Sequence, residues 1–201
     1  MLRLSAIDIA AERGGRQVFS RLSLSVQSGE LLAVTGPNGA GKSTLLRLLA
    51  GLLKPSAGKI QLEPEADAPR PQRMHYLGHL DALKPGFTLA ENLAFWRRLG
   101  DEPGRPVADA LDAVGLKALA ETPVLYLSAG QCRRVAIARL LVARRPVWLL
   151  DEPASGLDKA AEGRLGAIIE QALEEGTIVV AASHQALPVP ATATLQLGAA
   201  A

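Results

Sequence analysis

Aromatic residues are scarce in this sequence, and neither sign of charge dominates it. Phe, Trp and Tyr together make up 3% of the 201 residues, and the formal net charge is +2. Proteins that bind nucleic acid by stacking bases interleave aromatic side chains with a basic stripe, and this sequence has no such stretch. The composition therefore argues against nucleic acid as a partner.

Cysteine is almost absent, which excludes an internal disulfide. The single residue, Cys132, suits a reducing compartment such as the cytoplasm, where free thiols persist. We interpret its side chain as a small group that fills space on a helix, in preference to a reactive thiol.

Long apolar runs are also missing. No segment reaches the roughly 18 to 20 uninterrupted apolar residues that span a bilayer, so the sequence predicts no membrane crossing. Residues 1–12 lack the basic start and long apolar core of a secretory signal, because Asp8 and Glu12 interrupt them. We expect mature domain from the first residue.

The sequence does contain enough apolar material for one core. Ala, Leu and Val carry most of a hydrophobic fraction of 48%, and a chain of this length can fold as one α/β domain. Near the N-terminus, apolar residues that alternate with polar or small ones predict half-buried strands: Leu2, Leu4, Ile7, Ile9, Leu22, Leu24, Val26.

The most informative segment is a glycine-rich run at residues 36–44. Residues 31–35 before it predict a short buried strand. Leucines after it give the apolar stripe of a helix: Leu45, Leu46, Leu48, Leu49, Leu52, Leu53. A loop that leads from a strand into a helix N-terminus presents free N–H groups and the positive end of the helix dipole to an anion.

We interpret this run as a phosphate-binding loop for a nucleotide. Its spacing adds a lysine, Lys42, for the outer phosphates and a hydroxyl, Ser43, for magnesium. A plain glycine turn is the alternative, but such a turn has no use for Lys-Ser-Thr at the helix start. The predicted nucleotide-binding residues are Gly36, Pro37, Asn38, Gly39, Ala40, Gly41, Lys42, Ser43 and Thr44.

A helical pattern interrupts the strands between about residues 80 and 124. Thr88 and Glu91 have the spacing of a capping box, which predicts a helix start, and Gly115 predicts a helix stop. Between them, apolar residues recur at helical spacing: Leu89, Leu93, Trp96, Val107, Ala110, Leu111, Val114. A stretch rich in proline, alanine and charge at residues 63–72 predicts a surface loop before this insert.

Two carboxylates follow a short apolar run in the second half of the chain. Residues 147–150 predict a buried strand, and Asp151 and Glu152 come at its C-terminal edge, where α/β sheets bind ligands. One carboxylate there can hold Mg²⁺ through water, and its neighbour can orient or deprotonate an attacking water. A solvated acidic pair is the alternative, and the lysine and serine of the glycine-rich loop favour the nucleotide site.

Three arginines lie on a helix that is predicted after residues 127–131. We expect Arg133, Arg134 and Arg139 to be mostly solvated helix positions, in preference to an anion-binding patch. His75 receives no assigned role. His184 follows a predicted strand at residues 177–182, and a lone histidine there is ordinarily a surface or capping residue.

Residues 127–131, Leu-Ser-Ala-Gly-Gln, resemble the signature motif of the ATP-binding-cassette (ABC) ATPases. As in that family, they lie after a helical insert and shortly before the acidic strand end. Residues 183–185, Ser-His-Gln, resemble the family's switch histidine segment. A D-loop similar to the family's reads Ser155, Gly156, Leu157, Asp158. Five elements thus follow the family's order across about residues 1–198.

The resemblance implies an α/β fold of the P-loop NTPase class. An ABC ATPase has a RecA-like core, an antiparallel β-subdomain and a helical subdomain insert, here within a single domain at residues 1–201. The β-subdomain and core would occupy about residues 1–79 and 125–201, and the helical subdomain about residues 80–124.

The resemblance also implies a role for each motif. Asp151 and Ser43 would hold Mg²⁺, and Glu152 would be the catalytic base for ATP hydrolysis. His184 would contact the γ-phosphate and the attacking water. Four signature residues would act in trans, on ATP bound to a second copy of the chain or a related cassette: Ser128, Ala129, Gly130, Gln131. Free amides at a helix N-terminus suit such an anion, so an ATP-sandwich dimer is implied.

Two positions depart from the family pattern. The family has a glutamine between its core and its helical insert, where this chain has His79, which is therefore the candidate for that residue's magnesium role. The family also stacks the adenine on an aromatic residue of the first β-hairpin, where this chain has none. We predict that Arg13 or Arg16 covers the base with its guanidinium plane.

The particular residues in these motifs are similar to those of the cytochrome c maturation cassettes, a haem exporter family. The resemblance rests on Tyr-Leu-Gly-His at residues 76–79, on Leu-Ala-Glu-Asn-Leu-Ala-Phe-Trp at 89–96 and on Ser-His-Gln. It implies a peripheral ATPase on the cytoplasmic face of the bacterial inner membrane, with integral membrane subunits CcmB, CcmC and CcmD. ATP hydrolysis would serve haem export or release of the haem-loaded chaperone CcmE. The sequence itself has no Cys-x-x-Cys-His and suggests no haem site.

Other functions stay open on the sequence alone. One is the ATPase subunit of another small ABC transporter. Another is a soluble cassette of the DNA-repair or translation kind, although those usually carry two cassettes or a long coiled-coil insert. A P-loop kinase or GTPase is a third, but it would leave residues 127–131 unexplained.

Overall fold

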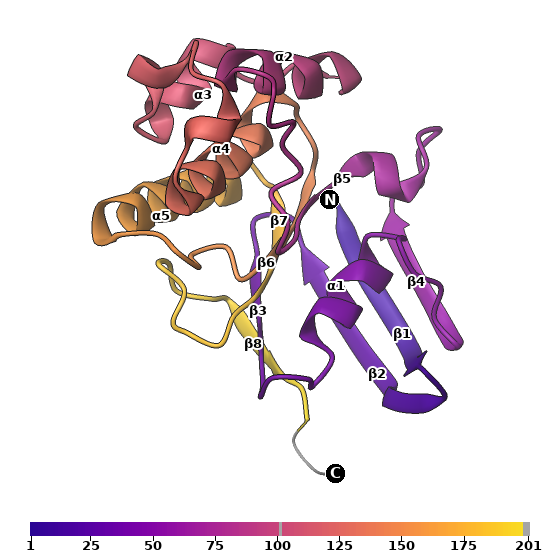
Figure 1. The fold of residues 1–201 in the computed structure, drawn as a ribbon. Coiled ribbons are helices and arrows are strands. Elements are labelled where there is room, and N and C mark those ends of the chain that lie inside the picture. Colours follow the sequence, from indigo (N-terminus) through magenta and orange to yellow (C-terminus); the bar gives the residue numbers. More distant parts are fainter. Residues whose placement is uncertain (101, 199–201) are drawn as a thin grey trace.

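The computed structural model describes residues 1–100 and 102–198, which build two sheets (Figure 1). The five-stranded sheet is parallel, in the order β5-β6-β7-β3-β8. Its strands are β3 (Leu31–Thr35), β5 (Met74–Leu77), β6 (Val147–Asp151), β7 (Ile178–Ala182) and β8 (Ala193–Gln196). The three-stranded sheet is antiparallel, in the order β2-β1-β4, with β1 (Arg3–Arg13), β2 (Arg16–Gln27) and β4 (Ala57–Glu63).

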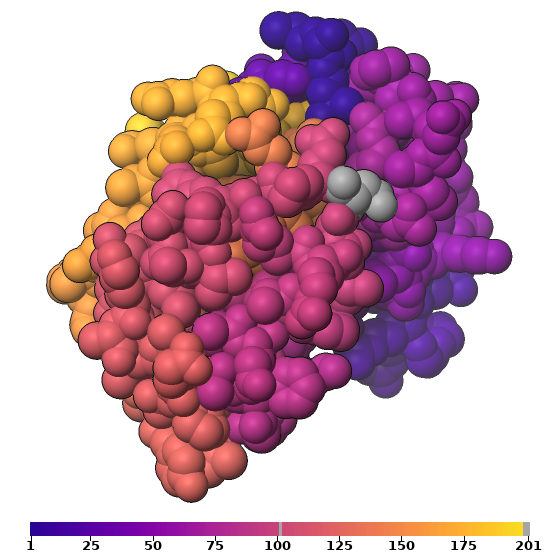
Figure 2. Space-filling model, turned by 90° about the horizontal axis from the view of Figure 1, so that it is seen from above, coloured from indigo at the N-terminus to yellow at the C-terminus, as the bar shows by residue number. Residues whose placement is uncertain are grey.

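Five α-helices accompany these sheets within the described residues. They are α1 (Lys42–Leu49), α2 (Leu89–Leu99), α3 (Val107–Ala113), α4 (Ala129–Val142) and α5 (Lys159–Glu174), with short 3₁₀ turns at Arg70–Arg73, Lys117–Leu119 and Val124–Tyr126. Seen from above, the segment from about residue 80 to 130 covers one face of the molecule (Figure 2). None of the helices within residues 1–100 and 102–198 is long and apolar enough to cross a membrane.

The central strands β3, β6 and β7 of the parallel sheet are largely buried on both faces, which is usual for such sheets, whereas the edge strand β8 is mostly exposed. Side chains alternate along each strand, so Val147 and Leu149 of β6 pack on one side with α1 and the antiparallel sheet. Trp148 and Leu150 pack on the other side with α4 and α5. Figure 1 shows the same division: α1 and β1, β2 and β4 lie on one side of the parallel strands, and α4 and α5 on the other. The predicted α/β fold of the P-loop class is confirmed.

Local signals in the sequence placed several element ends correctly. Thr88 and Glu91 form a full capping box at the start of α2, since the Thr88 Oγ1 accepts from the Glu91 N–H and the Glu91 carboxylate accepts from the Thr88 N–H. Gly115 follows α3 with a φ of 69°. Thr88 thus begins a helix and Gly115 ends one, as their local preferences predict.

The leucine stripe after the glycine-rich loop is shorter than predicted. The helix α1 ends at Leu49, and Gly51 then adopts a φ of 74°. The Gly51 N–H donates to the Leu48 carbonyl and the Leu52 N–H to the Arg47 carbonyl, which is the Schellman pattern of helix termination. Leu52 and Leu53 therefore lie beyond the helix, and both are exposed.

The first strand changes face partway along. Leu4 and Ala6 are buried, then Asp8 takes a φ of 48° and the register with β2 shifts, after which Ile9 and Ala11 are buried. An extra residue in one strand reverses the facing of every side chain that follows. Ile7, expected in the core, lies before this irregularity and faces away from Ala6, so it is 42% exposed, and the irregularity then brings Ile9 into the core.

His75, which has no role assigned from the sequence, is a buried residue of β5. Its Nε2 lies 2.8 Å from the Ala143 carbonyl oxygen, and the ring meets Trp148 edge to face. Burial lowers the pKa of His75 to about 3, opposed by the bond to Ala143 and assisted by the charges of Arg145 and Arg139. The imidazole is therefore neutral near pH 7, and its Nε2–H donates to the carbonyl.

We predict that His75 makes folding stability fall in mild acid. The imidazole of His75 binds a proton near pH 6.5 in the unfolded chain and only near pH 3 in the folded chain. The contribution of this site to the free energy of unfolding is therefore fully present above pH 6.5. It is lost at about 1.4 kcal/mol per pH unit below that. Urea unfolding of His75→Gln, which keeps a donor that does not titrate, should show a correspondingly flatter pH profile between pH 6 and 4. Identical slopes for both proteins would contradict this.

Candidate nucleotide-binding site

The candidate site lies where four parallel strands end. The loop after β3, the turn after β5, the acidic pair at the end of β6 and the segment after β7 all leave the sheet at its C-terminal edge. Parallel strands must end together at one edge, which is where such sheets bind ligands. Segments from residues 36–44, 78–79, 151–152 and 183–185 thus converge although they are far apart in the sequence.

The glycine-rich loop is compressed against neighbouring backbone. Gly36 has a φ of 139°, and a Cβ there would lie 2.4 Å from the Leu197 carbonyl oxygen. Gly41 caps α1 with a φ of 98°, and its Cβ would lie 2.5 Å from Val18. Because only glycine tolerates both the conformation and the space, these positions are fixed by the path of the loop.

Lys42 begins α1 and turns back over this loop. Its side chain is 7% exposed, and its Nζ donates to the carbonyl of Gly36 at 2.8 Å and to that of Pro37 at 3.2 Å. An ammonium group held among carbonyl oxygens at a helix N-terminus is placed where the outer phosphates of a nucleotide would meet it.

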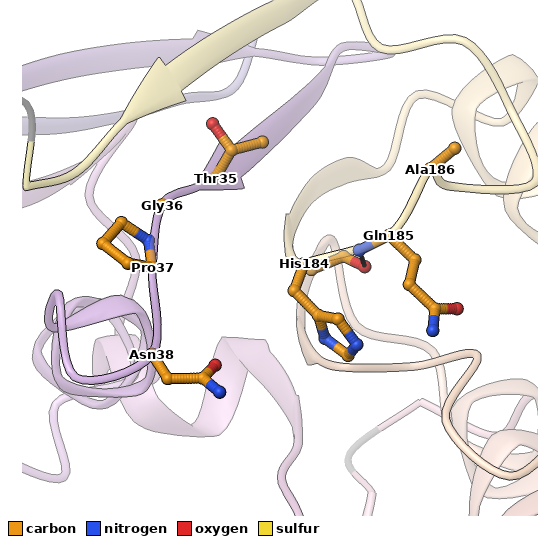
Figure 3. A pocket seen from close by; sticks show the side chains of 8 residues that line it. Thr35, Gly36, Pro37, Asn38, His184, Gln185 and Ala186 are labelled. Atoms are coloured by element: carbon orange, nitrogen blue, oxygen red, sulfur yellow. Dashed lines mark hydrogen bonds between the residues drawn. The ribbon is translucent and has the colours of Figure 1, made fainter.

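A cavity of about 600 Å³ opens beside the loop (Figure 3). One wall is formed by Thr35, Gly36, Pro37 and Asn38, and the facing wall by residues 183–186 after β7. Figure 3 shows the Asn38 and His184 side chains on opposite walls. Among the described residues that line this cavity, none comes from the signature motif or from Arg13.

Asp151 is the buried member of the acidic pair. It is 1% exposed, and its Oδ2 accepts a long hydrogen bond from the Tyr76 hydroxyl at 3.4 Å. The Nε2 of His79 lies 3.6 Å from the same oxygen, although the His79 side chain is 59% exposed. The Tyr76 hydroxyl in turn accepts from the Arg47 Nε at 3.4 Å, and burial raises the pKa of Tyr76 above its usual value.

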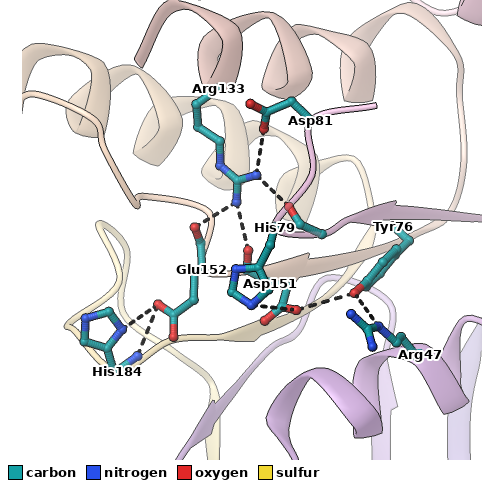
Figure 4. A network of polar contacts seen from close by, with 9 residues as sticks. Arg47, Tyr76, His79, Asp81, Arg133, Asp151, Glu152 and His184 are labelled. Atoms are coloured by element: carbon teal, nitrogen blue, oxygen red, sulfur yellow. Dashed lines mark hydrogen bonds and ion pairs between the residues drawn. The ribbon is translucent and has the colours of Figure 1, made fainter. Parts of the chain in front are cut away.

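Glu152 pairs with His184, which lines the cavity (Figure 4). The Glu152 Oε2 lies 2.9 Å from His184 Nδ1, and it also accepts from the His184 backbone N–H at 3.4 Å. The two side chains are 13% and 53% exposed. Glu152 has a φ of 48°, which non-glycine residues rarely adopt. A carboxylate oriented by an imidazole in this way can hold and deprotonate a water molecule.

The signature residues form the first turn of α4. Ser128 is the helix cap: its Oγ accepts from the Gln131 N–H at 3.2 Å, and its own N–H donates to the Gln131 Oε1 at 2.8 Å. A Cβ at Gly130 would lie 2.9 Å from the carbonyl oxygen of Gly156. The predicted signature and D-loop segments are therefore in contact within one chain, and both Ser128 and Gly156 are exposed.

The rest of the predicted D-loop forms a turn that leads into α5. The Ser155 N–H donates to the Glu152 carbonyl, and the Leu157 N–H donates to that of Ala154. Asp158 caps α5 by accepting from the Ala161 N–H at 2.8 Å. The turn thus begins at one of the two acidic residues.

Two predicted arginine positions are wrong. Arg133 and Arg139 are 6% and 4% exposed, where the sequence predicted solvated helix positions. Arg139 lies over the Trp96 ring and donates to the Tyr76 carbonyl, and burial lowers its pKa to about 10. Arg134 is partly exposed and donates to the Val114 carbonyl.

The apolar pattern of α4 does not distinguish Arg133 from Arg134. All residues from Val135 to Val142 are buried, so apolar residues follow both arginines at helical spacing. The burial of Arg133 is instead set by its acceptors on other segments.

Arg13 is not among the residues that line the cavity. It ends β1, pairs with Arg16 across the first hairpin and is exposed. The two glycines of the hairpin turn, Gly14 and Gly15, have positive φ values. Its predicted contact with adenine stays a prediction.

Comparison with known proteins places this site in a family. A family model described as ABC transporter matches residues 19–155. The cytochrome c biogenesis ATP-binding export protein CcmA of Rhodopseudomonas palustris (strain HaA2) is 50% identical over 202 residues, covering 100% of both chains. The protein of the same name from Nitrobacter winogradskyi is 51% identical over 203 residues, again covering 100% of both.

A solved structure shows the same fold. A putative ABC transporter ATP-binding protein from Pyrococcus furiosus superposes with a TM-score of 0.83 at 24% identity, covering 97% of each chain. Fold and site together define an ATP-binding P-loop protein of the ABC class. Within that class, the chain belongs to the family of the cytochrome c biogenesis ATP-binding export proteins.

The contact between α4 and the predicted D-loop can be tested at Gly130. A Cβ at this position would overlap the Gly156 carbonyl oxygen at 2.9 Å, so Gly130→Ala should displace one segment and slow ATP hydrolysis while the chain stays folded. Gly163→Ala is the matched control, because its Cβ would meet nothing within 4 Å on α5. The control should retain activity and gain about 0.5 to 1 kcal/mol of stability. Full ATPase activity of Gly130→Ala would show that hydrolysis does not depend on this contact.

Proposed function

We propose that the chain is the ATP-hydrolysing subunit of a membrane ABC complex that serves cytochrome c maturation. The observation that carries hydrolysis is the pairing of Glu152 with His184 at 2.9 Å, beside the cavity of the phosphate-binding loop. The assignment to cytochrome c maturation is supported by relatives about 50% identical over the whole chain whose names state that role.

In the proposed reaction, the chain first binds the triphosphate through its loop. The amides at residues 39–44 face the phosphates, and Lys42 exchanges its contacts with the Gly36 and Pro37 carbonyls for phosphate oxygens. Arg13 or Arg16 covers the adenine. The backbone thus supplies part of the affinity and the lysine supplies charge.

The oxygen donors near the loop suit Mg²⁺. The Ser43 hydroxyl and the buried Asp151 carboxylate are hard ligands of the kind that Mg²⁺ prefers. Mg²⁺, when bound, would neutralise charge on the phosphates. The His79 nitrogen is a poorer ligand for this ion, and its place 3.6 Å from Asp151 suits a contact to the carboxylate or to a water.

Glu152 then accepts the proton of the attacking water. His184 orients the Glu152 carboxylate and faces the loop across the cavity, where the γ-phosphate would lie. The chain supplies no donor from its own signature motif to this cavity. The α4 N-terminus of a second copy, or of a related cassette, is proposed to close the site from residues 128–131.

A membrane partner is proposed to dock on the face formed by the segment around α2. Phe87, Leu125 and Tyr126 are exposed there, and the Val124 N–H donates to the Phe87 carbonyl, which brings these apolar residues together. Leu80, at the entry to this segment, is also exposed. Integral membrane subunits of the CcmB, CcmC and CcmD kind would cover this surface on the cytoplasmic face of the inner membrane. Turnover would serve haem export or release of haem-loaded CcmE.

Hydrolysis is tested by Glu152→Gln. We expect kcat to fall by about 10² to 10⁴-fold, because the amide cannot accept the proton, while ATP still binds and a closed dimer accumulates. Single-turnover ATP hydrolysis, nucleotide binding and size-exclusion chromatography measure these effects. Glu174→Gln, an exposed carboxylate on α5, is the control. Near-normal turnover by Glu152→Gln would remove Glu152 as the base.

The membrane assignment is tested by co-purification. The tagged chain, extracted with detergent, should bring down integral membrane proteins identified by mass spectrometry. Leu125→Asp or Tyr126→Asp should release them, because each places a charge on the proposed apolar surface. Leu52→Asp, an exposed leucine beyond α1, should not. Recovery with ribosomes or DNA would favour a soluble cassette instead.

A further inference from the structure

Arg133 contacts the backbone of the acidic pair and of Pro153, the residue that follows it. It is 6% exposed on α4, and its Nη2 donates to the carbonyls of Asp151 and Glu152, each at 2.8 Å. Its Nε donates to the Pro153 carbonyl at 3.3 Å. The guanidinium therefore grips three successive carbonyls at the end of β6, as Figure 4 shows for the first two.

The same side chain also holds the turn after β5. Its Nη1 donates to the Gly78 carbonyl at 2.7 Å and to the Asp81 Oδ1 at 3.1 Å. Gly78 immediately precedes His79, and Asp81 lies where the chain enters the α2 region. One guanidinium thus joins α4, the end of β6 and the entry to the helical insert.

The backbone that Arg133 grips is strained. A φ of 48° is disfavoured for glutamate because the Cβ approaches the following carbonyl. Strained conformations persist only where their surroundings hold them. Three hydrogen bonds hold this one: the Glu152 N–H donates to the Ala182 carbonyl at 2.8 Å, and the Glu152 carbonyl accepts from Arg133 at 2.8 Å and from the Ser155 N–H at 3.1 Å.

We propose that Arg133 is a positioning residue for ATP hydrolysis, which holds the Glu152 backbone in the conformation that aims its carboxylate at His184. The inference rests on the proposed function, because it assumes that Glu152 is the base. All five side-chain hydrogen bonds of Arg133 go to protein acceptors. It acts through Glu152 alone, and it ties the position of that residue to the helix whose N-terminus carries the signature motif.

An arginine is required here by the geometry of the acceptors. The three nitrogens of one planar guanidinium donate five hydrogen bonds, four to backbone carbonyls and one to the Asp81 carboxylate, on two segments of the chain. A lysine offers one nitrogen with three donors on a flexible stem and cannot reproduce the fork. Both lysine and glutamine should therefore release the Glu152 backbone, although lysine keeps the charge beside Asp81.

The test measures ATP hydrolysis by Arg133→Gln and Arg133→Lys in the full chain with its membrane partners. We expect kcat to fall by about 10²-fold, the scale of a misplaced catalytic group, with the ATP dissociation constant unchanged. Arg134→Gln is the matched control, because this neighbour on α4 is partly exposed and donates to the Val114 carbonyl, away from the acidic pair. It should keep the wild-type kcat.

A double-mutant cycle separates positioning from general loss of structure. If Arg133 acts through Glu152, adding Arg133→Lys to Glu152→Gln should cost little further activity. Independent, multiplying effects would overturn the proposal, and so would a wild-type kcat in Arg133→Gln. If Arg133→Gln does not fold, the lysine variant decides by the same criteria. A wild-type chain that binds no ATP or does not hydrolyse it would overturn the proposed function, and this inference with it.

Discussion

The parallel sheet, whose central strands are buried on both faces, is the constraint on which the rest of the structure depends. Because α1 and the antiparallel sheet cover one face and α4 and α5 the other, polar chemistry has no place along the strands and must begin where they end. Four strands end at the same edge. The site therefore needs no long-range signal in the sequence beyond strand order: β3 carries the loop, β6 the carboxylates and β7 the histidine.

Features with a local cause could be read from the sequence. The phosphate-binding loop, the capping box at Thr88 and the strand before Asp151 each depend on residues a few positions apart, so spacing alone predicted them. The burial of Arg133 has a different origin. Its five acceptors lie 18 to 55 residues away, and four of them are backbone carbonyls. A carbonyl acceptor leaves no mark in the sequence, since any residue type supplies one.

Residues with positive φ interrupt two of the apolar patterns. Leu52 and Leu53 continue the leucine spacing of α1 but are exposed, because Gly51 ends the helix before them. Ile7 and Ile9 alternate in the sequence, but Asp8 between them has a φ of 48°, so that Ile7 is exposed and Ile9 is buried. Hydrophobic periodicity predicts the facing of side chains only while the backbone stays regular. Glycine signals such a reset more reliably than aspartate, so the end of α1 was the more predictable of the two.

The strain at Glu152 links stability to the proposed chemistry. Rare backbone conformations concentrate at functional sites. At such sites the surrounding structure imposes the conformation against the preference of the residue itself. Here those surroundings include α4, whose first residues, Ala129 and Gly130, have N–H groups with no acceptor in their own helix. In the proposed dimer these amides meet the nucleotide of the partner subunit. A shift of α4 on that contact would move Arg133 and with it the base of the chain's own site. The two sites would then respond to each other through one buried side chain, with no need for a change in the sheet itself.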